Sequence, residues 1–238
     1  MPSSSHGAGA ARMTSRRCAD LIDSASPASM LTERIGDAFA RPVDALVRAC
    51  ARFSPDVLTI TGLALNGVAC ALFALAGGKD YLRPDLLRAG GVVALLASVF
   101  DMLDGRVARL RGRESKRGAF LDSTMDRYSD MLLYMGLLVL YARVDRTPLM
   151  VLVWVAAFGS FMTSYARARA ESLIPRCTVG LLERPERIVL LILGALLNRM
   201  AAVLWVIAVL SNVTALQRIV YAYLELKRGA GEASVGPR

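Results

Sequence analysis

The sequence is poor in the residues that most often build zinc sites and nucleophile–base pairs. It contains one histidine, His6, and four cysteines, and no two cysteines form a Cys-x2-Cys pair. A structural zinc site needs four clustered Cys or His ligands, and a catalytic cysteine needs a basic partner. Neither kind of site is therefore expected. Cys70 is expected inside a helix as a small apolar residue.

The chain also lacks the polar composition of a soluble protein. Of its 238 residues 55% are hydrophobic, and the mean hydropathy is +0.44. A membrane-spanning helix needs about 20 mostly apolar residues, and several windows qualify. The net charge of +9 would suggest nucleic acid in a soluble protein. Here the basic residues gather in loops and at helix ends, where they suit anionic lipids and phosphorylated substrates, so no nucleic-acid partner is expected.

The spacing of apolar residues predicts an all-α integral membrane protein with six transmembrane helices and a preceding amphipathic helix. Residues 1–28 lack a continuous apolar stretch after their charges, which favours a disordered tail over a cleaved signal peptide. Residues 31–52 predict an amphipathic helix that lies on the membrane surface. The six spans are expected at about 57–77, 89–110, 118–142, 148–170, 185–198 and 200–225. The membrane domain then covers 29–228, and a second tail covers 229–238.

The loops indicate an orientation in the membrane. The 110–117 loop is strongly basic, and the 166–187 segment carries five arginines. Cytoplasmic loops carry an excess of Lys and Arg, so both segments and both termini are expected on the cytoplasmic side of the cell membrane. The opposite loops carry basic residues as well, which weakens this asymmetry.

Two pairs of aspartates lie at the edges of the second and third spans. Residues 101–126 read DMLDGRVARLRGRESKRGAFLDSTMD. On a helix Asp101 and Asp104 share one face, and so do Asp122 and Asp126. Antiparallel neighbouring helices would bring the pairs to one membrane depth. Ionisable groups there are functional candidates, and carboxylates that share a small space need a divalent cation.

Small and basic residues accompany the aspartates. Gly105 and Gly118 would let a bulky ligand approach the backbone, and Arg109 can hold a phosphate through two hydrogen bonds. The combination fits a metal-bound diphosphate. The alternative for any single aspartate is an ion pair at a helix end. Asp130, one turn beyond Asp126, stays open as a metal ligand, a group that supports the ligands, or an ion-pair partner.

The pattern D-x2-D-G-x2-A-R-x8-G-x3-D-x3-D resembles the signature of the CDP-alcohol phosphatidyltransferase family at all eight positions. The resemblance covers residues about 31–228. It implies a homodimer and two divalent ions, Mg²⁺ or Mn²⁺, that hold the diphosphate of a CDP-linked lipid. The implied metal ligands are Asp101, Asp104, Asp122 and Asp126, and Asp126 is also the implied general base. The implied CDP-binding residues are Thr59, Asp104, Gly105, Ala108, Arg109 and Gly118. Before Thr59, Asp56 stands where the family often has Asn.

Arginines embedded in later helices indicate the second substrate. Residues 164–171 read SYARARAE and residues 183–187 read ERPER. Arginines beside the metal site predict an acceptor with its own phosphate, whereas the alternative, above all for Arg169 and Arg184, is snorkelling to lipid headgroups. Both segments resemble the prokaryotic phosphatidylinositol-phosphate synthase branch of the family. That resemblance implies a phosphate pocket of Ser164, Arg167, Arg187 and Arg218, in which Arg167 replaces the usual lysine.

These observations predict an enzyme that transfers the phosphatidyl group of CDP-diacylglycerol to inositol phosphate and releases CMP. No protein nucleophile is required, because a carboxylate can take the proton of the attacking hydroxyl. A close alternative is glycerol 3-phosphate as acceptor, which would give phosphatidylglycerol phosphate. An ion or phosphate transporter could use the same buried aspartates, but the internal repeat common in transporters is not apparent.

Overall fold

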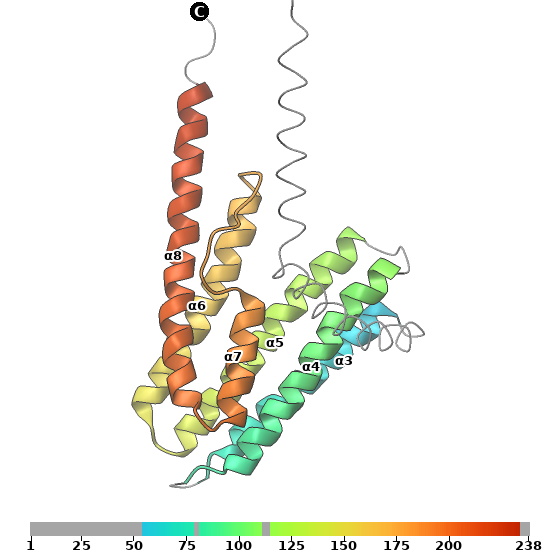
Figure 1. Ribbon diagram of the computed structural model, residues 1–238, viewed down its shortest axis with the longest axis vertical. Helices are drawn as coiled ribbons and strands as arrows, with labels where there is room; N and C mark the ends of the chain where they lie inside the picture. Colours follow the sequence, from blue (N-terminus) through green and yellow to red (C-terminus); the bar gives the residue numbers. More distant parts are fainter. Residues whose placement is uncertain (1–53, 79–80, 111–114, 234–238) are drawn as a thin grey trace, which may run out of the picture. The chain divides into compact units, whose positions relative to one another are not determined.

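The computed structural model describes residues 54–78, 81–110 and 115–233. The expected tail at 1–28 and the expected amphipathic helix at 31–52 lie outside the described residues. The described part is helical, and its only pairing between extended segments is an isolated bridge between Gly77 and Leu82. The helices are α3 (Pro55–Ala76), α4 (Pro84–Leu110), α5 (Lys116–Arg143), α6 (Thr147–Glu171), α7 (Arg184–Leu196) and α8 (Met200–Ala233). The all-α prediction is confirmed for these residues (Figure 1).

Each expected span falls on one helix, but the ends differ where local chemistry sets them. α4 begins at Pro84 and not near residue 89, because proline suits the first turn of a helix and Asp85 favours the helix N-terminus. α5 begins after Ser115, whose hydroxyl accepts a hydrogen bond from the Gly118 N–H at 3.0 Å. α8 continues to Ala233, so the prediction of a tail that begins at residue 229 is wrong for residues 229–233, which are helical.

Four of the described helices are long and apolar enough to cross a membrane. Their candidate spans are Asp56–Ala76, Pro84–Val107, Thr147–Glu171 and Met200–Arg228. α5 falls outside this set because its first half carries many charges, and α7 because it has only 13 residues. Thirteen helical residues extend about 20 Å, against about 30 Å for the hydrocarbon core of a bilayer. The four candidate spans make this the fold of a multi-pass membrane protein.

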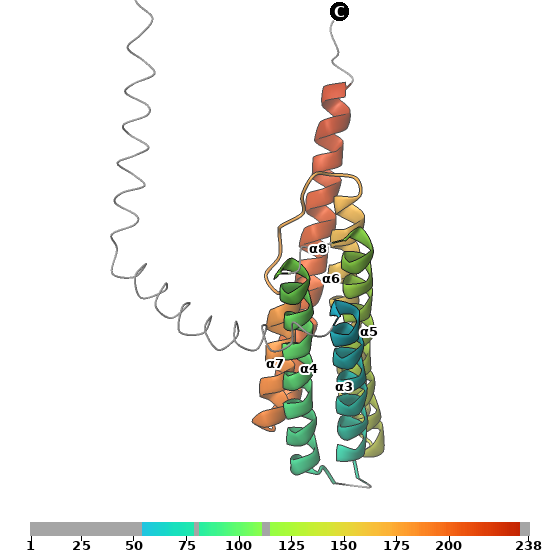
Figure 2. The same cartoon turned by 90° about the vertical axis from the view of Figure 1, so that its right-hand side faces the viewer.

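The packing of the helices gathers the sequence-predicted site at one end of the bundle. α3 packs against both α4 and α5, α4 packs against α7, and α8 packs against α6 and α7 (Figure 2). The buried core is rich in leucine from α5, α7 and α8, such as Leu137, Leu191 and Leu204. Because consecutive helices run in opposite directions, the starts of α3, α5 and α7 lie at the same end as the last turns of α4 and α6 (Figure 1).

Candidate active site

Three aspartates from two helices form one group of carboxylates. Asp101 comes from the last turns of α4, and Asp122 and Asp126 come from the first turns of α5. One oxygen of each carboxylate lies within 4.8 Å of the corresponding oxygens of the other two. Three of the four aspartates in the two predicted pairs therefore lie close together.

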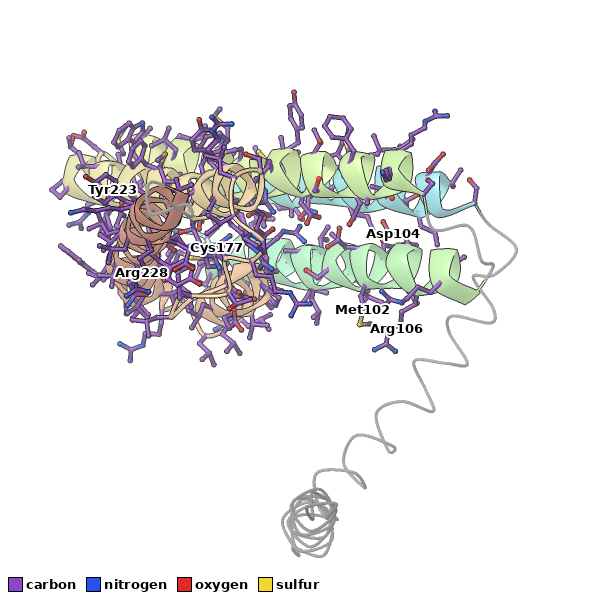
Figure 3. All side chains as sticks on the ribbon, turned by 90° about the horizontal axis from the view of Figure 1, so that it is seen from above. Met102, Asp104, Arg106, Cys177, Tyr223 and Arg228 are labelled. Carbon is purple, nitrogen blue, oxygen red and sulfur yellow. The ribbon has the colours of Figure 1, made fainter. Side chains whose placement is uncertain are left out.

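The fourth aspartate of the pattern faces a different neighbour. Asp104 is 3% exposed, and its Oδ2 accepts a hydrogen bond of 2.6 Å from the Thr59 hydroxyl of α3. Figure 3 shows Asp104 on the side of α4 that faces the gap toward α3 and α5, while Met102 and Arg106 point away from that gap. Asp104 therefore contacts α3 and is not part of the group of three.

A cavity of about 640 Å³ opens beside Asp104 between α3, α4 and α5. Its lining includes five of the six residues predicted to bind CDP, namely Thr59, Asp104, Gly105, Arg109 and Gly118. The sixth, Ala108, lies in α4, and its side chain is outside the described part. A side chain at Gly105 would meet no atom within 4 Å, so the absence of a side chain there leaves this region open to a ligand and serves no close helix packing.

Arg184, the first residue of α7, lies against the carboxylate group. Its Nη1 is 2.7 Å from Asp101 Oδ2 and 2.9 Å from Asp126 Oδ1, and its Nε donates to Asp130 Oδ1 at 3.1 Å. The three carboxylates of Asp101, Asp126 and Asp130 lie around the guanidinium, and an arginine side chain stays protonated in proteins. The guanidinium is therefore a permanent positive charge among these carboxylates.

Asp130 lies outside the group of three and binds arginines. It is 3% exposed, and its Oδ2 is 3.7 Å from Nη2 of Arg187, while its Oδ1 accepts from Arg184. The sequence leaves three roles open for Asp130, and in the structure it forms ion pairs with Arg184 and Arg187.

The donor set suits a divalent cation. Carboxylate oxygens are the ligands that Mg²⁺ and Mn²⁺ prefer in proteins. Oδ1 of Asp126 is buried and accepts no hydrogen bond, although it lies close to Arg184, so it retains a lone pair for a metal. The residues present therefore fit a metal site.

The four residues predicted for the acceptor phosphate differ in how far their polar groups are already used. Arg187 is 1% exposed, donates only a long bond of 3.4 Å to the Leu182 carbonyl, and leaves Nε and Nη2 without a hydrogen-bond acceptor. Arg218 is buried and donates to the Val179 and Thr163 carbonyls and to Glu183 at 2.8–3.1 Å.

The other two members of this set are partly engaged. Arg167 bonds Glu171 at 3.0 Å and shares Glu183 with Arg218 at 3.5 Å. The Ser164 hydroxyl makes a long bond of 3.4 Å to the Ser160 carbonyl. Arg187 is therefore the member of this set whose buried donors most clearly lack partners.

Comparison with known proteins assigns the chain to a family. The family model for CDP-alcohol phosphatidyltransferase matches residues 52–222. The chain belongs to the CDP-alcohol phosphatidyltransferase family. It is therefore an enzyme, and membership of this transferase family weighs against the transporter alternative.

Members of this family with assigned names are similar over most of their length. The phosphatidylinositol phosphate synthase of Mycobacterium tuberculosis (strain H37Rv) is 37% identical over 195 residues, which cover 76% of this chain and 86% of that protein. The archaetidylinositol phosphate synthase of Methanothermobacter thermautotrophicus is 38% identical over 179 residues, covering 72% and 84%.

Two solved structures of the M. tuberculosis phosphatidylinositol phosphate synthase have a similar fold. The structure with CDP-DAG bound has a TM-score of 0.67 and 31% identity, covering 77% of this chain and 94% of that one. The structure in complex with manganese and citrate has a TM-score of 0.68 and 32% identity, covering 76% and 88%.

The sequence of this phosphatidyltransferase did not reveal every residue of the site. Lys116 and Arg117 line the cavity beside Asp104, although the basic loop served in the sequence only as a topology signal. For Arg184 the sequence leaves a phosphate contact and a lipid-facing position open, whereas in the structure its guanidinium contacts Asp101 and Asp126. The signal that could have found it is its spacing from Arg187, because residues three apart share a helix face.

Proposed function

We propose that the chain transfers the phosphatidyl group of CDP-diacylglycerol to inositol phosphate, which gives phosphatidylinositol phosphate and CMP. The observation that favours a phosphorylated acceptor is the buried Arg187, whose Nε and Nη2 lack hydrogen-bond acceptors. Buried N–H groups without a hydrogen-bond acceptor are costly, and a phosphate that accepts their hydrogen bonds removes that cost. The names of the similar proteins agree with an inositol phosphate acceptor.

In this proposal CDP-diacylglycerol binds through the cavity between α3, α4 and α5. Thr59, Gly105, Ala108, Arg109 and Gly118 would contact the CDP group, together with Asp104. Lys116 and Arg117, which also line the cavity, would add positive charge near the diphosphate. The position of Arg109 in the lining supports a contact with phosphate, since a guanidinium binds phosphate oxygens in pairs.

The carboxylate group would hold the metal. Asp101, Asp104, Asp122 and Asp126 would be the ligands of two divalent ions, Mg²⁺ or Mn²⁺. Bound divalent ions would neutralise the diphosphate and the charge that develops on the leaving CMP. A relative whose structure contains manganese supports the choice of ion.

Asp126 would act as general base. Its carboxylate would take the proton of the acceptor hydroxyl, whose oxygen forms a bond to the phosphorus that carries the diacylglycerol. The bond from this phosphorus to the oxygen of CMP breaks, and CMP leaves with the electron pair. Oδ1 of Asp126 accepts no hydrogen bond from the described residues, which supports this role because a base must accept a proton.

The acceptor pocket would be formed by Ser164, Arg167, Arg187 and Arg218. Arg187 would bind the phosphate directly. Because Arg218 already donates to two backbone carbonyls and to Glu183, we assign it the further task of holding the residues before α7 in place. Glycerol 3-phosphate also carries a phosphate and remains the second candidate acceptor.

We further propose the membrane arrangement. Residues 29–228 would form the membrane domain, with an amphipathic helix at 31–52 on the surface, six spans that include α5 and α7, and a tail at 1–28. The active site and both termini would face the cytoplasm, and the enzyme would be a homodimer. Large apolar side chains exposed along the helices, such as Ile60, Trp154 and Trp205, support contact with a lipid bilayer.

A CMP-release assay on the purified enzyme tests the proposal. With CDP-diacylglycerol and Mg²⁺ or Mn²⁺, inositol phosphate should give rapid CMP release, and inositol, glycerol 3-phosphate and serine should give little. Preference for glycerol 3-phosphate would replace the acceptor but keep the reaction class.

A further inference from the structure

One arginine occupies the place of a cation in the carboxylate group. Nη1 of Arg184 lies 2.7 Å from Asp101 Oδ2 and 2.9 Å from Asp126 Oδ1. Both carboxylates belong to the group of three, in which one oxygen of each residue lies within 4.8 Å of one oxygen of the other two. Carboxylates this close repel each other, and the guanidinium supplies the opposite charge that lets them remain together.

A divalent ion and Arg184 would compete for the same oxygens. Asp101 and Asp126 would hold a divalent ion through their carboxylate oxygens, which are the ligands that Mg²⁺ prefers. The Nη1 group of Arg184 already contacts one oxygen of each carboxylate. Two cations at this place would repel each other, so binding of one weakens binding of the other.

The Asp130 carboxylate, outside the group of three, binds a different nitrogen of the Arg184 guanidinium. Nε of Arg184 donates to Asp130 Oδ1 at 3.1 Å, and Asp130 is 3% exposed and lies outside the group of three. The backbone beside Arg184 is fixed, because the Glu186 carboxylate accepts from the Glu183 N–H at 2.8 Å and closes the first turn of α7. If the Arg184 guanidinium changes its partner, the side chain would therefore move while the backbone stays in place.

We propose that Arg184 is the internal counter-cation of the carboxylate group and that a divalent ion displaces its Nη1 from Asp101 and Asp126. Asp130 stays hydrogen-bonded to the guanidinium during this exchange, which makes Asp130 a positioning residue and not a metal ligand. This inference rests on the metal site of the proposed function. It also explains why a fifth aspartate follows the four of the pattern by one helical turn.

Calorimetric titration of the full-length protein with Mn²⁺ alone, without substrates, tests the exchange. Arg184→Gln removes the competitor, so Mn²⁺ should bind about five- to fiftyfold more tightly than to the wild type. Asp130→Asn should have the opposite effect, a loss of about three- to tenfold, because the displaced guanidinium loses its remaining partner. Unchanged or weaker Mn²⁺ binding by Arg184→Gln would overturn the proposal.

The double variant separates positioning from ligation. If Asp130 acts only through Arg184, the double variant of Arg184→Gln and Asp130→Asn should bind Mn²⁺ as tightly as Arg184→Gln alone. If Asp130 is a ligand of the metal, the double variant should bind more weakly than Arg184→Gln by the same factor that separates Asp130→Asn from the wild type. That second result would overturn the positioning role.

Thermal unfolding gives an independent readout. Without metal, Arg184→Gln should lower the Tm because the carboxylates lose their counter-charge, and Mn²⁺ should raise its Tm by more than that of the wild type. If the glutamine variant does not fold, Arg184→Lys can be used instead. Its gain in Mn²⁺ affinity should be smaller than that expected for Arg184→Gln, since one ammonium group cannot bridge all three carboxylates. The control is Arg169→Gln, which replaces an exposed arginine on α6 and should match the wild type in Tm and in Mn²⁺ affinity.

These results also separate the exchange from the metal site itself. A wild type that binds no Mn²⁺ would refute both the metal site and the exchange. A wild type that binds Mn²⁺ with the same affinity as Arg184→Gln would refute the exchange alone.

Discussion

The substitution Arg187→Ala should weaken acceptor binding and leave CDP-lipid binding nearly unchanged. In the structure the Arg187 side chain makes one hydrogen bond of 3.4 Å and, through Nη2, one ion pair of 3.7 Å with Asp130, while Nε and Nη2 have no hydrogen-bond acceptor. Its loss therefore removes few strong contacts from the unliganded protein. A charge-assisted contact with a phosphate contributes roughly 1.5–3 kcal/mol, which corresponds to about a ten- to hundredfold rise in the acceptor KM.

Steady-state kinetics of CMP release, with each substrate varied in turn, measure this effect. Arg187→Lys should recover part of the affinity because it keeps the charge but loses the paired donors. Arg169→Ala is a matched control, since it removes an exposed arginine from the last turn of α6 and should change neither KM. Equal rises in both KM values for Arg187→Ala would refute the phosphate contact and indicate a structural ion pair with Asp130.

Three further outcomes are expected. Asp126→Asn should lower kcat by about 10²–10⁴-fold, and further through the lost metal ligand, while CDP-lipid binding partly survives; near-normal turnover would exclude the base role. Asp101→Ala or Asp122→Ala should weaken Mg²⁺ and CDP binding together, because metal and diphosphate are mutual ligands; titration of Mg²⁺ with and without CDP measures this, and unaffected metal binding would move the site elsewhere. In a cysteine-free background, the Ser115→Cys variant should react with a membrane-impermeant thiol reagent added on the cytoplasmic side only. The Asp145→Cys variant should react with the reagent on the opposite side only, and the reverse pattern would show that the proposed topology is inverted.

The aspartate pattern could be predicted from the sequence because its spacing is local. Residues three or four apart share a helix face, and the apolar windows determined the helices on which they lie. Asp101, Asp122 and Asp126 therefore met as expected. The contact of Asp104 with Thr59 is between residues far apart in the sequence, and the order of helix packing was needed to find it.

The arginines were harder to predict because an arginine side chain is long and its partners are set by packing. The same guanidinium can reach a lipid headgroup, a carboxylate or a backbone carbonyl. Arg184 turned toward Asp101 and Asp126, and Arg218 binds carbonyls of the residues that precede α7 and of α6. Neither outcome follows from helical periodicity, which gives the face of a helix but not the conformation of the loop beside it.

The acceptor panel in the CMP-release assay tests the central claim most directly. The purified enzyme, supplied with CDP-diacylglycerol and Mg²⁺ or Mn²⁺, should release CMP with inositol phosphate at a kcat/KM at least about tenfold above that with inositol, since inositol lacks the phosphate that Arg187 would bind. A preference for inositol over inositol phosphate would contradict the acceptor pocket, and no release of CMP with any of the four acceptors would contradict the proposed reaction.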